Sequence, residues 1–496
     1  MAARRHRWML DGQCAATGQI NESLRRRFFL KSRFHAAQRM VAIRPNVVTH
    51  WPMLWLYRLL FLPALLALSP VWIWHVLRRG GYGHGFWQRL GFFPKLAEKT
   101  GKRRIWIHGV SVGEIQSLRP LVERLAEEKC YDLVVTATSS TGLAIAQKLY
   151  GALATVGVFP IDFYPCSRLA WSRIQPDLVL LADGELWPEH LANAHRHTVP
   201  VVVVNGRLSD KSYGRYRRLP GLFRWQTRHL TAVLASGKES FDRFCELGMD
   251  KKNVLQLGNL KCDRPALPPI DAVDRSELLL ELGLCPLDAN GDPTPILFGC
   301  STWPGEEKLL LEVFAILRSR QPSWRLILTP RHGERRRELR QLLATCGVDA
   351  HFRSDGPAAS TGQNLATVID TTGELGRLIR LGTVAFLGKT LPPNAGSQSP
   401  LDAVAAGVPI VAGPNIGNFR DILSDLQHLG AAVIGSDRDA VADGLLALAE
   451  NGKQRAAMAT IGKSWLEKNA GATERICSAI RSWTLPSTVH GSAIER

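Results

Sequence analysis

Short apolar runs alternate with helical segments along most of this chain, and this alternation restricts the fold more than any other feature of the sequence. It is typical of βαβ units, in which helices connect parallel strands. A linker with two proline-rich stretches, Pro265 to Pro269 and Pro286 to Pro295, separates the runs into two series. The first series is Ile105–Ile107, Leu133–Ala137, Leu178–Leu181, Val199–Val204 and Ala232–Ala235, and the second is Ile296–Phe298, Arg325–Leu328, Val384–Phe386 and Ile410–Val411.

The two series predict an α/β protein with two Rossmann-like domains that face each other across a cleft. A chain of 496 residues is long enough for two such domains and additional segments. We expect the first domain at residues 80–270 and the second at residues 290–485. Because ligands bind at the carboxyl ends of strands in open α/β sheets, polar residues directly after each run are the candidates for a functional site.

The N-terminal part of the chain has a different character. Residues 1–50 are basic and lack a sustained apolar period, which predicts a disordered extension. Residues 51–79 are largely apolar, have aromatic residues near both ends and are long enough to cross a bilayer, so we expect a membrane anchor helix there. Arg58, Pro63 and Pro70 interrupt this segment, and a monotopic anchor or a cleaved signal peptide remain alternatives.

Charge and cysteine content narrow the class of partner and the compartment. The net charge of +18 suits phosphate-rich partners, namely nucleic acid, an anionic membrane or a phosphorylated lipid, but does not choose among them. The nine cysteines are scattered without C-x-x-C spacing, which indicates neither a zinc site nor a disulfide framework and favours a reducing compartment.

The first strand of the first series ends in a turn of small residues, His108 to Glu114, that opens a helix. Ser111 and Glu114 have the spacing of a capping box, in which both side chains satisfy N–H groups of the helix start. Alternatively, Glu114 is a general base beside exposed backbone N–H groups. Burial would raise the pKa of this carboxyl and the helix N-terminus would lower it.

Three further motifs lie at strand ends or beside the linker in the first half. Asp183 to Pro188 is either a helix start, with Asp183 as N-cap and Pro188 in the first turn, or a pair of functional carboxylates. Asn205 to Ser212 leads into a basic run that is either a solvated face or a site for lipid-borne phosphate. Lys261, just before the linker, is either a surface charge or a cation that offsets charge on a substrate.

Three strand ends in the second half outline a nucleotide pocket. Gly299 to Glu307 offers small residues at a helix start, where phosphate can approach backbone N–H groups. Pro330 to His332 ends another run, and Asp370 to Leu375 follows the run Thr367–Ile369. The segment Leu387 to Thr390 lacks the earlier glycine of a P-loop and is not interpreted as one.

Taken together, these motifs resemble one family, the 3-deoxy-D-manno-octulosonic acid (Kdo) transferases of lipopolysaccharide synthesis. The resemblance extends from about Met53 to the region of Trp465. The matching pieces are the N-terminal anchor, Arg89 to Gly91, His108 to Glu114, Glu185 to Pro188, Asn205 to Ser212, Gly258 to Lys261, Pro330 to His332 and Asp370 to Leu375.

The resemblance implies a two-domain inverting glycosyltransferase of the GT-B type that needs no metal and no cofactor. It implies CMP-Kdo as donor and a lipid A precursor, lipid IVA, as acceptor, with no nucleic acid partner. The enzyme would sit at the inner leaflet of the inner membrane, with its catalytic domain on the cytoplasmic side.

The resemblance also implies roles for individual residues. Glu114 would be the general base, and Glu185 and Lys261 would stabilise the transition state. Ser111, Arg207 and Lys211 are the candidates for acceptor binding. The CMP donor would contact Pro330, Arg331, Gly373, Glu374 and Leu375, with Ser399 and Asp402 in the same pocket.

The chain departs from the family pattern on the donor side. Ser399 and Asp402 replace an Asn and a Glu, Trp303 stands where a His is usual, and Lys389 stands where a Gly is usual. Another sugar transferase or a nucleotide-sugar epimerase of the same architecture, with an altered donor, therefore remains an alternative. A third interpretation is a non-enzymatic, anchored basic protein that binds anionic lipid or nucleic acid.

Overall fold

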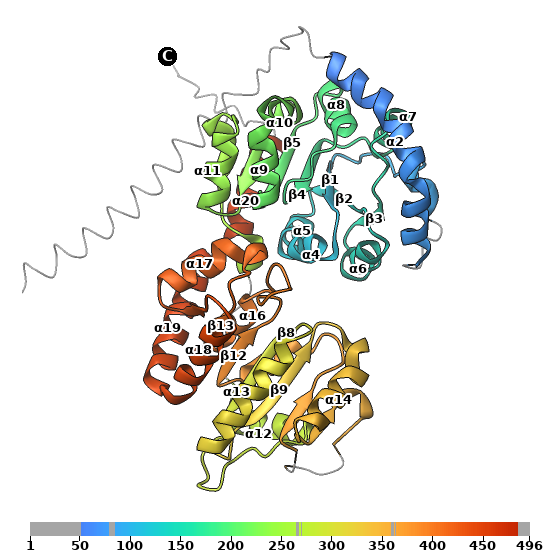
Figure 1. Cartoon of the computed structure of the whole chain (residues 1–496). Coiled ribbons are helices and arrows are strands. Elements are labelled where there is room, and N and C mark those ends of the chain that lie inside the picture. Colours follow the sequence, from blue (N-terminus) through green and yellow to red (C-terminus); the bar gives the residue numbers. More distant parts are fainter. Residues whose placement is uncertain are drawn as a thin grey trace, which may run out of the picture.

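Two parallel sheets of seven strands each form the centre of the two domains (Figure 1). The computed structural model describes residues 51–78, 85–263, 267–268, 270–358, 362 and 364–484. The extension expected at residues 1–50 lies outside these residues. The α/β class and the two Rossmann-like domains predicted from the sequence are confirmed.

The first sheet has the strand order β3-β2-β1-β4-β5-β6-β7. Its interior strands are buried on both faces, as parallel sheets covered by helices require. The strands are β1 (Arg103–Gly109), β2 (Tyr131–Ala137), β3 (Thr155–Val158), β4 (Leu178–Ala182), β5 (Val201–Gly206), β6 (Ala232–Ala235) and β7 (Val254–Gln256).

Helices cover both faces of the first sheet. One face packs against α4 (Val112–Ser117), α5 (Arg119–Glu127) and α6 (Ser140–Tyr150). The other face packs against α7 (Tyr164–Ile174), α8 (Pro188–Arg196), α9 (Asp210–Arg218), α10 (Pro220–Thr227) and α11 (Lys238–Glu246). The short helix α3 (Phe86–Arg89) and the 3-10 turns η2 (Lys251–Asn253) and η3 (Leu260–Cys262) complete this half.

The second sheet has the equivalent order β10-β11-β9-β8-β12-β13-β14. Its strands are β8 (Ile296–Thr302), β9 (Arg325–Pro330), β10 (Ala350–Phe352), β11 (Ala366–Val368), β12 (Val384–Leu387), β13 (Ile410–Ala412) and β14 (Ala432–Ile434). Its helices are α12 (Ala272–Glu281), α13 (Glu306–Arg320), α14 (Arg336–Thr345), α15 (Leu375–Leu378), α16 (Leu401–Ala406), α17 (Arg420–His428), α18 (Arg438–Glu450) and α19 (Gly452–Asn469). The short 3-10 turns are η4 (Gly333–Arg335), η5 (Arg353–Asp355), η6 (Ile379–Leu381) and η7 (Gly417–Phe419).

The last helix, α20 (Ala472–Thr484), returns to the first domain. Its buried residues Ile476, Cys477, Ala479 and Ile480 join the core beneath α5 and α6. By packing, α20 therefore belongs to the first domain, although it lies within the range 290–485 expected for the second.

The segment expected to be a membrane anchor is the helix α2 (Trp51–Arg78), which runs along the outside of the first domain beside α7 and α8 (Figure 1). It contains Pro63 and Pro70. None of the helices in the described part of the chain combines the length and apolar character that crossing a bilayer requires. A membrane-spanning role for α2 is thus not supported.

Candidate active site

Three carboxylates from two neighbouring strand ends come together on the first domain. Glu114 lies in the first turn of α4, directly after β1, and Asp183 and Glu185 follow β4, which pairs with β1. The start of α4 lies on the side of the first domain turned toward the second (Figure 1). The structure therefore brings the predicted residues Glu114 and Glu185 into one site and adds Asp183 to it.

Backbone and side-chain bonds at the start of α4 fix the position of Glu114. Its Oε2 accepts a hydrogen bond from the backbone N–H of Val110 at 2.7 Å, and its Oε1 accepts one from the Ser111 hydroxyl at 3.0 Å. In return, the Ser111 hydroxyl oxygen accepts from the backbone N–H of Glu114. The predicted cap by Ser111 is confirmed, whereas the Glu114 carboxylate binds the N–H of Val110, one residue before the N-cap, and not that of Ser111.

The environment of Glu114 raises its pKa to about 7. Burial contributes most, the charge of Asp183 comes next, and Glu185 adds a smaller contribution. The hydrogen bonds from Val110 and Ser111 act in the opposite direction but do not prevail. A carboxyl group with a pKa near neutral pH is well matched to accept a proton at that pH.

The prediction that Asp183 caps the next helix is wrong. Helix α8 begins at Pro188, with Trp187 as its N-cap residue, whereas Asp183 has a left-handed backbone (φ 56°). Its Oδ1 accepts a hydrogen bond from the Asn205 side-chain amide at 2.8 Å, and Asn205 is itself left-handed (φ 54°). Non-glycine residues in this conformation are uncommon and gather at functional sites.

Glu185 keeps its contact with solvent. Even so, the surrounding protein and the Asp183 carboxylate raise its pKa, and Arg215 on α9 opposes this change. The pKa values of the neighbouring acids Glu114 and Glu185 are both raised, as is typical of sites that transfer protons.

Lys261 and Arg207 extend from the first domain to the second. The Lys261 ammonium lies 5.1 Å from the ring centre of Phe419, and the Arg207 guanidinium donates to the backbone carbonyl of Asn418. Arg207 also lies 3.7 Å from the Asp183 carboxylate. Lys261 and Arg207 line a pocket between the domains together with Asn418 and Phe419, which confirms the predicted cleft on this side of the molecule.

The three acceptor candidates lie apart from one another. Ser111 caps α4 beside Glu114, and Arg207 lies at the interdomain pocket. Lys211 is exposed in the first turn of α9, which continues into Arg215, Arg217 and Arg218.

The donor candidates lie at the carboxyl ends of the second sheet, as predicted. Pro330 ends β9, and the exposed Arg331 donates its backbone N–H to the carbonyl of Thr302 at the end of β8. Gly373 has a positive φ of 93° and an open space where a side chain would begin. Glu374 and Leu375 follow at the start of α15.

Glu374 is bound within the protein. It accepts hydrogen bonds from Thr371 and from Arg353, which also pairs with Glu281. Of the last two donor candidates, Ser399 accepts from the backbone N–H of Leu401 at 3.4 Å, and Asp402 lies in the first turn of α16 near Gly376.

Glu306 lies in the predicted motif Gly299 to Glu307, but the sequence analysis gave this carboxylate no role of its own. This buried side chain accepts hydrogen bonds from the backbone N–H groups of Trp303, Lys389, Thr390 and Leu391 at 2.8–3.1 Å. It therefore ties the loop after β8 to the loop after β12. Its place after the small residues of Gly299 to Gly305 was the only signal in the sequence.

Two departures from the family pattern contact each other. The Lys389 ammonium lies 4.9 Å from the centre of the Trp303 ring, which in turn meets His332 edge-on. Lys389 has a left-handed backbone (φ 64°), the conformation for which a glycine would be favoured. Among the residues that the structure describes, no group of three or more His, Cys, Asp or Glu side chains could hold a metal ion.

Known proteins are similar to this chain in sequence and in fold. The profile of the family described as 3-deoxy-D-manno-octulosonic-acid transferase (kdotransferase) matches residues 84–264. The 3-deoxy-D-manno-octulosonic acid transferase of Bordetella pertussis is 31% identical over 85% of this chain and 98% of its own length, and that of Chlamydia muridarum is 28% identical over 84% and 94%.

Solved structures extend the likeness in fold to both domains. HepE of Anabaena in complex with UDP aligns with a TM-score of 0.55 at 15% identity, over 77% of this chain and all of that one. The UDP-GlcNAc 2-epimerase of Neisseria meningitidis bound to UDP-GlcNAc aligns with a TM-score of 0.51 at 13% identity, over 76% and 99%. The Bordetella relative shows that the chain belongs to the 3-deoxy-D-manno-octulosonic acid transferase family.

Proposed function

We propose that this glycosyltransferase moves Kdo from CMP-Kdo to a hydroxyl group of a lipid A precursor such as lipid IVA, with inversion and without a metal ion. Its family membership makes it a transferase of lipopolysaccharide synthesis, not a non-enzymatic lipid- or nucleic-acid-binding protein. The observation that carries the proposed chemistry is the Glu114 carboxyl group, whose pKa of about 7 lets it act as a base near neutral pH.

In the proposed reaction, the acceptor hydroxyl oxygen attacks the anomeric carbon of Kdo while the bond from that carbon to the CMP phosphate oxygen breaks. Glu114 takes the proton of the hydroxyl. Glu185 and Lys261 stabilise the charges of the transition state. The electron pair of the broken bond leaves with CMP, so one proton and one glycosyl group are transferred and nothing is oxidised.

The negative charge that develops on CMP requires positive groups on the donor side. Arg331 is exposed at the end of β9, and α15 and α16 present backbone N–H groups at their starts. Such groups stabilise anionic oxygens. We assign Pro330, Arg331, Gly373, Glu374, Leu375, Ser399 and Asp402 to this pocket.

We further propose that α2 lies on the membrane surface without crossing it. The side chains of Trp55, Leu56, Leu59, Leu60 and Leu66 are 54–72% exposed. An apolar helix face of this kind inserts into the headgroup region of a bilayer. The acceptor side, with Ser111, Arg207 and Lys211, would then face lipid on the cytoplasmic side of the inner membrane.

The substitution Glu114→Gln tests the base. It removes the proton acceptor but keeps the size of the side chain, so we expect kcat to fall about 10²–10⁴-fold while CMP still binds. The measurements are CMP release from CMP-Kdo with lipid IVA and calorimetric titration with CMP. Glu123→Gln, an exposed residue on α5 paired with Arg119, is the matched control and should keep its activity. Retained activity in Glu114→Gln would refute the assigned role.

One alternative is a donor other than CMP-Kdo, because Lys389 and Trp303, which contact each other, both depart from the family pattern. A panel of nucleotides and nucleotide sugars distinguishes the two. If CMP binds at least tenfold more tightly than UDP and GDP, the CMP donor stands; if UDP binds best, the protein uses an altered donor.

A further inference from the structure

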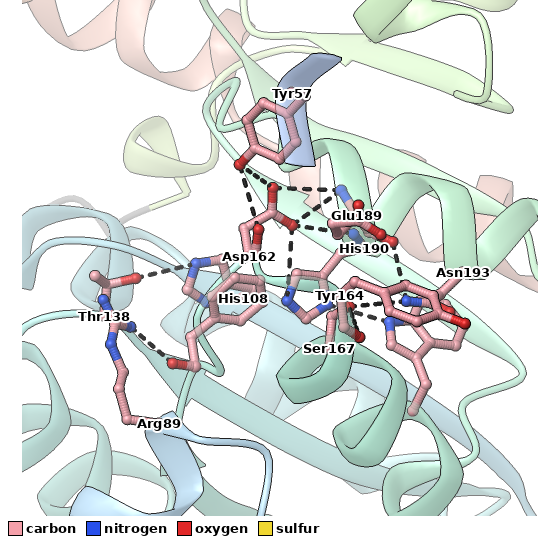
Figure 2. A network of polar contacts seen from close by, with 12 residues as sticks. Tyr57, Arg89, His108, Thr138, Asp162, Tyr164, Ser167, Glu189, His190 and Asn193 are labelled. Carbon is pink, nitrogen blue, oxygen red and sulfur yellow. Dashed lines mark hydrogen bonds and ion pairs between the residues drawn. The ribbon is translucent and has the colours of Figure 1, made fainter. Parts of the chain in front are cut away.

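A buried network attaches α2 to the first domain through Asp162 and Glu189 (Figure 2). The Tyr57 hydroxyl donates to Oδ2 of Asp162 at 2.7 Å. The Arg58 guanidinium donates to both carboxylate oxygens of Glu189 at 2.5 and 3.0 Å. Arg58, Asp162 and Glu189 have side chains that are at most 10% exposed. Such buried, two-pronged contacts are stronger and more directional than surface ion pairs.

Asp162 supplies the cap that α8 lacks within its own sequence. Trp187, the N-cap residue of α8, makes no capping bond with its side chain. Instead, Asp162 accepts from the backbone N–H groups of Glu189 and His190 at 3.1 Å each (Figure 2). These are N–H groups of the first helical turn, which need a partner. The start of α8 is thus held between Asp162 and Arg58.

The residues held in this way adjoin the acidic turn after β4. Glu185 precedes Glu189 by only four residues, and Trp187 lies between them. The Trp187 ring contacts Phe159 at 5.6 Å between ring centres. Fixing the first turn of α8 therefore fixes one end of the segment that carries Asp183 and Glu185.

The same network reaches the turn that carries Glu114. Phe159, three residues before Asp162, stacks on His108 with 3.6 Å between ring centres. His108 is a buried residue near the end of β1, directly before the Gly109–Glu114 turn. The loop of residues 159–163 consequently contacts His108 and Trp187, which adjoin the two acidic turns. Helix α2 holds this loop from outside through Tyr57 and through the stack of Phe61 on Phe163.

We propose that α2 is a brace for the acidic site as well as a contact with the membrane, and that Tyr57 and Arg58 are positioning residues for Glu114 and Glu185. The brace acts through Asp162 and Glu189 and touches no substrate itself. This inference rests on the proposed roles of the two acids in Kdo transfer.

Three variants test the brace with a substrate that needs no membrane, a detergent-dispersed lipid A precursor. Arg58→Met removes the partner of the buried Glu189, and we expect kcat to fall about 10–100-fold with an unchanged KM for CMP-Kdo, because misplacement by about 1 Å has this effect. Tyr57→Phe deletes one hydroxyl and should lower kcat about three- to tenfold. In Arg58→Met/Glu189→Gln the unpaired charge is gone, so the melting temperature should recover while kcat stays low.

A pH profile separates positioning from a general loss of stability. Asp183 and Glu185 raise the pKa of Glu114, so their displacement moves the acid limb of kcat/KM to lower pH in Arg58→Met. The matched control is Arg104→Met, which breaks another buried arginine pair, to Asp132, at the amino end of β1. Arg104→Met should lower the melting temperature without moving the acid limb of the kcat/KM profile.

The proposal is overturned if Arg58→Met keeps its kcat and acid limb, or if activity recovers together with the melting temperature in the double variant. Failure of the wild-type protein to transfer Kdo would count against the proposed function. The brace has its own readout in that event: hydrogen exchange at residues 183–190 should become faster in Arg58→Met than in Arg104→Met, and equal exchange refutes it.

Discussion

Glu114 combines a structural role at the start of α4 with the catalytic role that we propose for it. Its two oxygens accept bonds from Val110 and Ser111, which complete the start of α4, and burial beside Asp183 raises its pKa. The capping bonds fix its orientation, and the neighbouring acids set its proton affinity. A structural role at the helix start and a general base are therefore compatible at this position.

The raised pKa of Glu114 predicts an acid limb near pH 7. Because the base must be deprotonated, activity should fall about tenfold per pH unit below the pKa of about 7. An unperturbed glutamate would place this limb near pH 4.5. The measurement is kcat/KM for CMP release between pH 5 and 9 at constant ionic strength. A limb below pH 5.5 would contradict the assignment.

Removing the Ser111 hydroxyl should have two separate effects, one on the stability of α4 and one on the pKa of Glu114. Ser111→Ala loses the side-chain cap of α4, which costs about 1 kcal/mol of unfolding free energy. It also loses a hydrogen bond that lowers the pKa of Glu114, so the acid limb should move to higher pH. Chemical denaturation and the same pH series measure the two effects. Ser139→Ala, which removes the equivalent cap of α6, should change stability alone.

In the second domain, Glu306 is a buried carboxylate that, like Glu114, binds backbone N–H groups at a strand end. Glu306→Gln would turn an amide N–H₂ group toward backbone N–H donors, and we expect a loss of about 2 kcal/mol in unfolding free energy. Because the loop of Lys389 to Leu391 then loosens, CMP affinity should fall about tenfold, equivalent to 1.4 kcal/mol. Denaturation and calorimetric titration measure these changes. Unchanged CMP affinity would remove Glu306 from the donor site.

At the scale of elements, every strand predicted from the sequence is present, and the four that were not predicted are the four sheet edges. These are β3, β7, β10 and β14, each of three or four residues. Interior strands are buried on both faces and form continuous apolar runs. Edge strands are short and partly exposed, so their sequences lack that signal.

Part of the acidic site could be predicted from the sequence, because two of its residues directly follow interior strands. Glu114 and Glu185 follow apolar runs that are adjacent in the sheet, and strand-end position is visible in the sequence. The left-handed backbone of Asp183 and its bond to Asn205 depend on tertiary packing. The bond from Tyr57 to Asp162 joins residues 105 positions apart, and no spacing rule connects them.

At the scale of the whole molecule, a carboxyl pair joins the two domains. Asp421, at the start of α17, shares a hydrogen bond with Glu239 in the first turn of α11. Ion pairs surround it: Arg420 binds Asp210 across the interface at 2.8 Å, and Arg243 binds both Asp210 and Glu239. Burial and Glu239 raise the pKa of Asp421 to about 7, although Arg207 and Arg243 oppose this.

This pair predicts that the two domains separate more readily as the pH rises. The folded protein binds the shared proton more tightly than the unfolded chain, whose aspartates have a pKa near 3.8. Its contribution to stability is therefore complete below about pH 4 and is lost as the pH rises to about 7. Above pH 7 two carboxylates face each other at the interface, and their repulsion favours the open arrangement.

Small-angle scattering at pH 6 and pH 8.5 should show a larger radius of gyration at the higher pH. Asp421→Asn, in which residue 421 cannot ionise, should abolish the difference. A radius that depends equally on pH in Asp421→Asn and in the wild-type protein would place the pH response elsewhere in the molecule.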